Sequence, residues 1–149
     1  MASKMPVLNH MHGPFDLERF VDAQNPVFKD VRSDLRRGRK QGHWMWFIFP
    51  QIKGLGSSWM AQKFAISSRA EAEAYLAHPI LGSRLIECTQ LVNAVEGRSM
   101  EQIFGSVDTL KFRSSITLFA EVTRDCCVFT EALHKFFAGR PDRLTLDRL

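Results

Sequence analysis

The sequence has few cysteines and no long hydrophobic segment, and both shortages narrow the class of protein. Its 149 residues include only three cysteines, Cys88, Cys126 and Cys127, an odd number without a C-x-x-C pair. Neither a disulfide framework nor a zinc site is predicted from them. No stretch approaches 18 consecutive apolar residues, and the first residues lack the apolar core of a secretory signal. We therefore expect a cytoplasmic protein that does not enter a membrane.

Familiar catalytic and nucleotide-binding motifs are also missing. The chain has no G-x-S-x-G elbow, no G-x-x-x-x-G-K-[ST] loop and no strand-led G-x-G-x-x-G. We predict no metal and no cofactor, and the sequence leaves open whether the protein is an enzyme. The net charge of +4, from 20 Lys plus Arg against 16 Asp plus Glu, favours anionic partners without identifying one.

Helix start signals are frequent in the chain. Ser68 and Ser99 each begin a capping box, in which a serine hydroxyl and the residue three positions later satisfy free backbone amides. Asn25 followed by Pro26 is typical of a helix N-cap and first helical position. No segment alternates with period two between turn signals, apart from an ambiguous aromatic run. The chain is therefore predicted to be all-α.

Apolar stripes at helical spacing support this fold class. They run from Leu81 to Val95 and from Phe129 to Phe137, and residues 106–122 are apolar on several faces, as expected of a central helix. We predict a flexible N-terminal arm over residues 1–14 and one helical domain over residues 15–149. The domain should contain about six or seven short helices, packed as a curved, orthogonal or superhelical bundle, with a short tail from Leu144.

The most distinctive stretch is GHWMWFIFPQIKGLGSS, residues 42–58. Its six consecutive apolar residues, 44–49, would cover about 9 Å as a helix, too short for a hydrocarbon core of about 30 Å. The favoured interpretation is a segment that threads through the core, because aromatic side chains dominate core energetics. The alternative is the wall of a ligand pocket, formed by Trp44 and Trp46 and bracketed by the polar side chains of His43 and Gln51.

The turn that follows this run has two interpretations as well. Gly54 and Gly56 permit close backbone approach, and Ser57 or Ser58 would cap a helix that begins near Trp59. The turn is then an ordinary connector with a helix cap. Alternatively, its backbone amides and the neighbouring Lys53 form a seat for an anion.

Charges near the central helix are the last candidates. Asp108 and Lys111 form either a surface pair or, if the helix is buried, part of a site together with Arg113, Ser114 and Ser115. The basic run from Arg36 to Lys40 is interpreted as a solvated helix end, with phosphate contact as the alternative.

Four unusual stretches occur in order along the chain: GRKQGHWMWFIFPQIKGLGSS, AYLAHPILGSRL, IFGSVDTLKFRSSITLF and FTEALHKFFAGRPDRLTL. Together they resemble the bacterial family catalogued as domain of unknown function 1810, some of whose members are labelled calpastatin. The resemblance implies a mostly helical, curved single domain from Phe15 onward and brings no established reaction. The calpastatin label conflicts with the apolar stripes of a folded globule, since eukaryotic calpastatin is a disordered inhibitor.

A fainter similarity is to small helical proteins that act on ADP-ribose-linked groups. It rests on Ala61-Gln62-Lys63-Phe64 and on the helix around residues 77–85. The acidic residue expected shortly before the first motif is replaced here by Ser57, Ser58 and Trp59.

Three functions follow from these observations. The first is binding of an anionic small molecule, nucleotide or ADP-ribose-like, in a cleft beside residues 43–58. The second is a non-enzymatic protein interaction module, and the third, ranked below both, is nucleic-acid binding. The candidate ligand-binding residues are His43, Trp44, Trp46, Gln51, Lys53, Gly54, Gly56, Ser57, Asp108 and Lys111.

Overall fold

The computed structural model describes residues 13–123 and 127–149, so that almost all of the predicted N-terminal arm and Cys126 lie outside the described residues. This part of the chain is helical and contains no strand, as predicted. None of its helices is long and apolar enough to cross a membrane. The described helices are α2 (Glu18–Gln24), α3 (Phe28–Arg37), α4 (Met45–Ile48), α5 (Trp59–Lys63), α6 (Arg69–Ala77), α7 (Leu81–Asn93), α8 (Met100–Val122), α9 (Val128–Phe137) and α10 (Arg143–Asp147).

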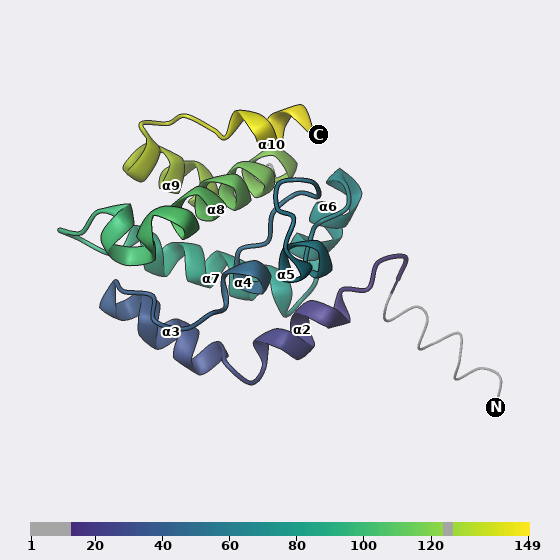
Figure 1. Ribbon diagram of the computed structural model, residues 1–149, viewed down its shortest axis with the longest axis horizontal. Coiled ribbons are helices and arrows are strands. Elements are labelled where there is room, and N and C mark those ends of the chain that lie inside the picture. The colour runs from purple at the N-terminus through teal and green to yellow at the C-terminus, as the bar shows by residue number, and fades with distance from the viewer. Residues whose placement is uncertain (1–12, 124–126) are drawn as a thin grey trace.

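Helix α8 occupies the middle of the bundle, as the sequence predicts for residues 106–122. It packs against α4, α6, α9 and α10, while α7 packs against α3, α6 and α9 (Figure 1). Phe112 and Phe119 of α8 are fully buried. The Phe112 ring meets that of Phe49 edge to face at 5.0 Å, and Phe119 lies 5.4 Å from Tyr75. Aromatic contacts therefore join α8 to the aromatic run at one point and to α6 at another.

The aromatic run forms core, which confirms the favoured interpretation. Met45, Ile48 and Phe49 are each no more than 2% exposed, and only Trp46 within the run is half-buried. The run winds through one turn of helix, α4, before Pro50. Trp44 is 2% exposed, and its indole N–H donates to the Asp34 carboxylate at 3.1 Å.

Two predictions at helix ends are wrong. Asn25 does not cap α3; it continues α2, with helical dihedral angles and its amide bonded to the Val21 carbonyl, and α3 begins only at Phe28. The short tail predicted from Leu144 instead lies largely within a further helix, α10. The Asp142 carboxylate accepts from the Thr145 amide at 3.1 Å and starts α10. Together with α4, this helix raises the number of helices above the six or seven expected.

Candidate functional site

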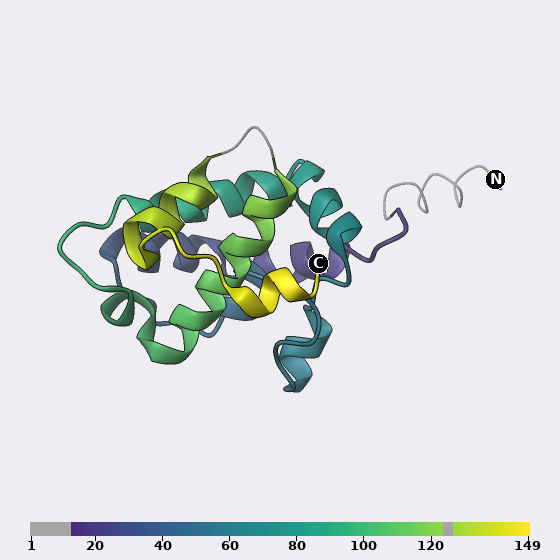
Figure 2. The ribbon, with the colours of Figure 1, turned by 90° about the horizontal axis from the view of Figure 1, so that it is seen from above.

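Residues 53–65 form a loop whose two ends lie next to each other on the helical bundle. Its ends are joined by a parallel bridge between Ile52 and Ile66. The Lys53 amide donates to the Ile66 carbonyl and the Ile66 amide donates to the Gln51 carbonyl, each at 2.8 Å. Both isoleucines are buried. Such a compact loop with adjacent ends is an Ω-loop, and it projects from the bundle in Figure 2.

Inside the Ω-loop lies the short helix α5. Ser58 caps it by accepting from the Ala61 amide at 3.1 Å, as the sequence predicts. The Gln62 side chain donates to the Ser57 carbonyl at 2.7 Å and closes the turn before the helix. None of the five residues of α5 is buried. The helix is therefore held by local hydrogen bonds and contributes little to the core.

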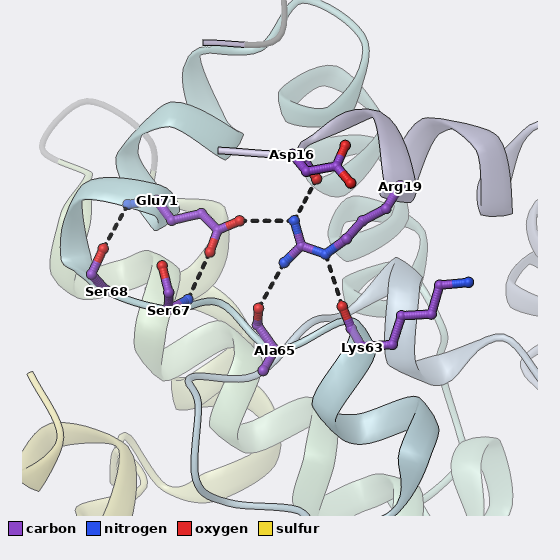
Figure 3. Close-up of polar contacts among 7 residues, drawn as sticks. All are labelled: Asp16, Arg19, Lys63, Ala65, Ser67, Ser68 and Glu71. Carbon is purple, nitrogen blue, oxygen red and sulfur yellow. Dashed lines mark hydrogen bonds and ion pairs between the residues drawn. The ribbon is translucent and has the colours of Figure 1, made fainter. Parts of the chain in front are cut away.

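Arg19 of α2 holds the returning side of the Ω-loop (Figure 3). Its guanidinium donates to the Lys63 and Ala65 carbonyls, both at 2.8 Å, and also to the Asp16 carbonyl. It further pairs at 3.0 Å with Glu71, which is 2% exposed. Glu71 in turn accepts from the Ser67 amide at 2.7 Å. A buried charge pair thus fixes the backbone of residues 63–67.

The Ω-loop encloses a cleft with a volume of about 590 Å³. This volume is within the range of about 300 to 1,000 Å³ typical of small-molecule sites. Four of the predicted site residues, all from the glycine-rich turn, line this cleft. The lining side chains include no carboxylate, imidazole or thiol, and their polar groups are one ammonium, one amide and two hydroxyls. The lining residues are Lys53, Gly54, Gly56, Ser57, Ala61, Gln62, Ala65 and Ser67.

A second cation lies beside this cleft, and sequence reasoning missed it. The Arg148 guanidinium follows α10 and lies against Gly54, where a Cβ on Gly54 would stand 2.7 Å from Nη1 and 2.9 Å from Cζ. Gly54 also has a φ of +98°, which favours glycine. Because Arg148 comes from the segment predicted to be a tail, no spacing in the sequence connects it to Gly54.

The aromatic candidates lie elsewhere. His43 is exposed, whereas Trp44 is sealed against Asp34. The Asp34 carboxylate also accepts from the Gln41 and Gly42 amides at 2.9 and 3.0 Å. Burial alone would raise the pKa of Asp34, but these hydrogen bonds and the nearby Arg37 guanidinium lower it overall. Trp44 is thus a structural residue in this arrangement.

Asp108 and Lys111 lie together on α8, beside Trp46 of α4 and apart from the Ω-loop cleft. The Lys111 ammonium lies 4.9 Å from the centroid of the Trp46 ring and 3.7 Å from the Asp108 carboxylate. Lys40 makes the closer pair with Asp108, at 2.8 Å. Gln51, at the base of the Ω-loop, is half-buried and uses its carbonyl in the bridge. None of these residues lines the Ω-loop cleft, so the ten candidates do not converge on one space.

No candidate metal site is found in the part of the chain that is described. Over residues 13–123 and 127–149, no group of three or more His, Cys, Asp or Glu side chains could hold a metal ion.

The fold defines a single-domain all-α protein with a projecting Ω-loop, and comparison with known proteins places it in a family. The chain belongs to the family described as protein of unknown function DUF1810, whose model matches residues 14–149. A crystal structure of the conserved hypothetical protein Rv1873 from Mycobacterium tuberculosis is similar, with 56% sequence identity and a TM-score of 0.91. The match covers 92% of this chain and 98% of that one. No curated protein matches the chain.

Proposed function

We propose that the Ω-loop cleft binds an anionic small molecule, nucleotide or ADP-ribose-like, in a protein of the cytoplasm. One observation carries the proposal. Lys53 lines the cleft, Arg148 lies against Gly54, which also lines it, and neither cation forms an ion pair with any residue described.

The rest of the cleft suits an anion. The hydroxyls of Ser57 and Ser67 can donate to it. Carbonyl oxygens would repel an anion, and those of Lys63 and of the lining residue Ala65 accept from Arg19. Gly54 has no side chain, so the Arg148 guanidinium can approach the backbone of a lining residue closely. Charge-assisted hydrogen bonds from Lys and Arg are about twice as strong as neutral ones.

Calorimetry with a panel of nucleotides and with pyrophosphate tests this proposal. We expect Lys53→Glu and Arg148→Glu each to lower the affinity about tenfold or more, because a hydrogen bond to a charged group contributes roughly 1.5 to 3 kcal/mol. Lys29→Glu and Arg36→Glu are matched controls, since both side chains are exposed and lie on α3. Equal losses in controls and test variants, or a panel without any binding, would overturn the proposal.

A protein interaction module is the second candidate. Val107 and Leu110 on α8 are 65% and 66% exposed, and Leu144 on α10 is 61% exposed. Helix α10 begins to cover this face of α8 at Ser114, whose hydroxyl donates to Asp142 at 3.0 Å. Leu110 and Val107 lie about one and two turns before Ser114 on α8 and remain exposed to solvent. A partner lost with Leu110→Asp and retained by Lys53→Glu would favour this function over the first.

Nucleic-acid binding ranks third. Arg36 and Arg39 are exposed, whereas Arg37 and Lys40 pair with Asp34 and Asp108. This function predicts an affinity that falls steeply with salt. It is excluded if changing all four basic residues to Glu leaves binding intact.

A further inference from the structure

Trp59 is the most exposed large hydrophobic residue described in the molecule. It is 70% exposed at the start of α5, a helix that buries none of its residues. A tryptophan in water forgoes roughly 2 to 3 kcal/mol of burial energy. The stability of the fold gives no reason for this side chain, whose exposed surface can contact a ligand.

One face of the indole is already supported. The Lys63 ammonium, one helical turn on, lies 5.0 Å from the centroid of the Trp59 ring and 5.3 Å from that of Phe64. Phe64 is buried, so this cation bridges the exposed ring to the core. With 70% of the residue in solvent, the opposite face of the indole remains open. A supported ring with one open face is the arrangement on which planar groups stack.

Trp59 lies close along the chain to residues that line the anion cleft. Trp59 follows Ser57 by two residues, so their Cα atoms are about 7 Å apart at most. Ala61 and Gln62 of the same helix turn also line the cleft. A ligand whose anionic group reaches Lys53 can therefore extend a planar group along α5.

We propose that the ligand of the Ω-loop cleft is a nucleoside phosphate whose base stacks on Trp59. The proposal rests on the proposed function, because it takes the cleft beside Lys53 and Arg148 as the phosphate site. Trp59 supplies affinity for the base without selecting among bases, since every base has a π-face. The cleft volume of about 590 Å³ accommodates one nucleotide.

The test compares four probes by calorimetry: pyrophosphate, a nucleoside, the nucleoside diphosphate and a single-stranded oligonucleotide. We expect the diphosphate to bind about tenfold or more tightly than pyrophosphate, because stacking on an aromatic side chain contributes roughly 1 to 3 kcal/mol per base. Trp59→Ala should remove this difference and leave pyrophosphate affinity within about twofold. Trp59→Phe should retain most of it. Trp46→Phe is the matched control and should change neither affinity.

The outcomes separate the two proposals. Pyrophosphate that binds as tightly as the diphosphate, or a Trp59→Ala variant with unchanged diphosphate affinity, overturns the stacking role and leaves the anion site standing. No binding of either phosphate overturns both. An oligonucleotide that binds more tightly than the diphosphate, with the same dependence on Trp59, replaces the nucleotide by single-stranded nucleic acid. Equal melting temperatures of the variants show that each remains folded.

Discussion

At the scale of single residues, one buried carboxylate organises the entry to the aromatic run. Asp34, 4% exposed on α3, accepts from the Gln41 and Gly42 amides and from the Trp44 indole. The indole N–H would otherwise be buried without a partner, which is costly, while the hydrogen bonds of the two amides are part-buried. The carboxylate therefore joins the C-terminal end of α3 to the start of the core segment, and it does so as the ionised form.

Replacing Asp34 by Ala should lower the free energy of unfolding by about 3 kcal/mol, because three donors lose their acceptor. Urea denaturation measures the change. Asp30→Ala, at an exposed position one turn earlier on the same helix, is the control and should stay within about 0.5 kcal/mol of the parent protein. A similar small effect at Asp34 would show that water replaces these hydrogen bonds.

The same carboxylate predicts a pH dependence. The pKa of Asp34 is lower in the folded protein than its ordinary value of 3.8. A depressed pKa stabilises the fold above the ordinary value, and this contribution is lost as the pH falls below it. Asp34→Asn should therefore flatten the decrease in melting temperature between about pH 4 and pH 2. If the melting temperature of the variant falls with pH as steeply as that of the parent protein, other carboxylates cause the decrease.

Cys88 and Cys127 should differ in reactivity. Burial raises the pKa of the Cys88 thiol to about 12, while Cys127 is exposed. Because the thiolate is the reactive form, iodoacetamide at pH 8 should modify Cys127 and spare Cys88 in the folded protein. Mass spectrometry of the peptides measures both, and denaturant should make Cys88 react. Rapid native modification of Cys88 would mean that α7 opens readily.

At the scale of elements, α8 is two helical segments joined at a glycine. Gly105 has φ +82° and ψ 165°, outside the helical region, and the Thr109 hydroxyl donates to its carbonyl at 2.7 Å. The capping box at Ser99 starts the first segment, as predicted. The break redirects the chain before residues 106–122 enter the core. The position therefore needs a residue without a side chain for conformational reasons.

Gly105→Ala should destabilise the protein by about 1 to 3 kcal/mol. No atom within 4 Å would meet the added Cβ, so the cost lies in the backbone angles alone. Thermal unfolding measures it. Val107→Ala, at an exposed position two residues on, provides the control with a small expected change. A neutral Gly105→Ala variant would show that the two segments can align as one straight helix.

Most of the elements could be predicted from the sequence because their signals are local. A serine and the residue three positions on define a cap, and the apolar stripe of α7 defines its buried face. The turn before α7 is held locally as well, since the His78 Nδ1 accepts from the Ile80 and Leu81 amides at 3.1 and 3.2 Å. Helix α10 was missed because it covers α8 through Asp142, a long-range contact without periodicity.

The candidate site was predictable only where its residues are neighbours in sequence. Lys53, Gly54, Gly56 and Ser57 lie together in the cleft because one turn carries them. Arg19 and Glu71, which hold residues 63–67, come from α2 and α6, and Arg148, which lies against Gly54, comes from the end of the chain. Only folding brings these residues close to the turn. Asp108 and Lys111 were predicted to belong to the same site because charges on a buried helix must either face a cleft or be compensated by a partner. Lys40 supplies that compensation instead.

At the scale of the whole molecule, Arg19 connects three elements through polar contacts, beside the aromatic contacts of Phe20 with Phe64 and Tyr75. It joins α2 to the returning side of the Ω-loop and to Glu71 on α6 (Figure 3). Because α5 buries no residue, these hydrogen bonds and the Ile52–Ile66 bridge carry much of the loop's attachment. The loop is therefore expected to open locally at a lower free energy than the core.

Arg19→Lys should accelerate amide hydrogen exchange in residues 53–66 and leave α8 unchanged. A lysine can keep the charge pair with Glu71, but its compact ammonium cannot match the fork that reaches both carbonyls. Exchange measured by mass spectrometry resolves the two regions. The control is Arg69→Lys, whose guanidinium donates to the Glu121 carbonyl away from the Ω-loop. If residues 53–66 exchange as slowly in the Arg19→Lys variant as in the parent protein, the Ile52–Ile66 bridge alone holds the loop.

The projecting Ω-loop also bears on how this protein can diversify. Its ends meet at Ile52 and Ile66, so that the intervening segment can change in length or composition without moving the helices that flank it. Substitutions at Trp59 or Ser57 alter exposed positions, whereas those at Phe49 or Phe112 alter the core. Selection for a new ligand can then act on one segment without eroding the stability of the bundle, and the same separation makes the loop a natural place for engineered binding sequences.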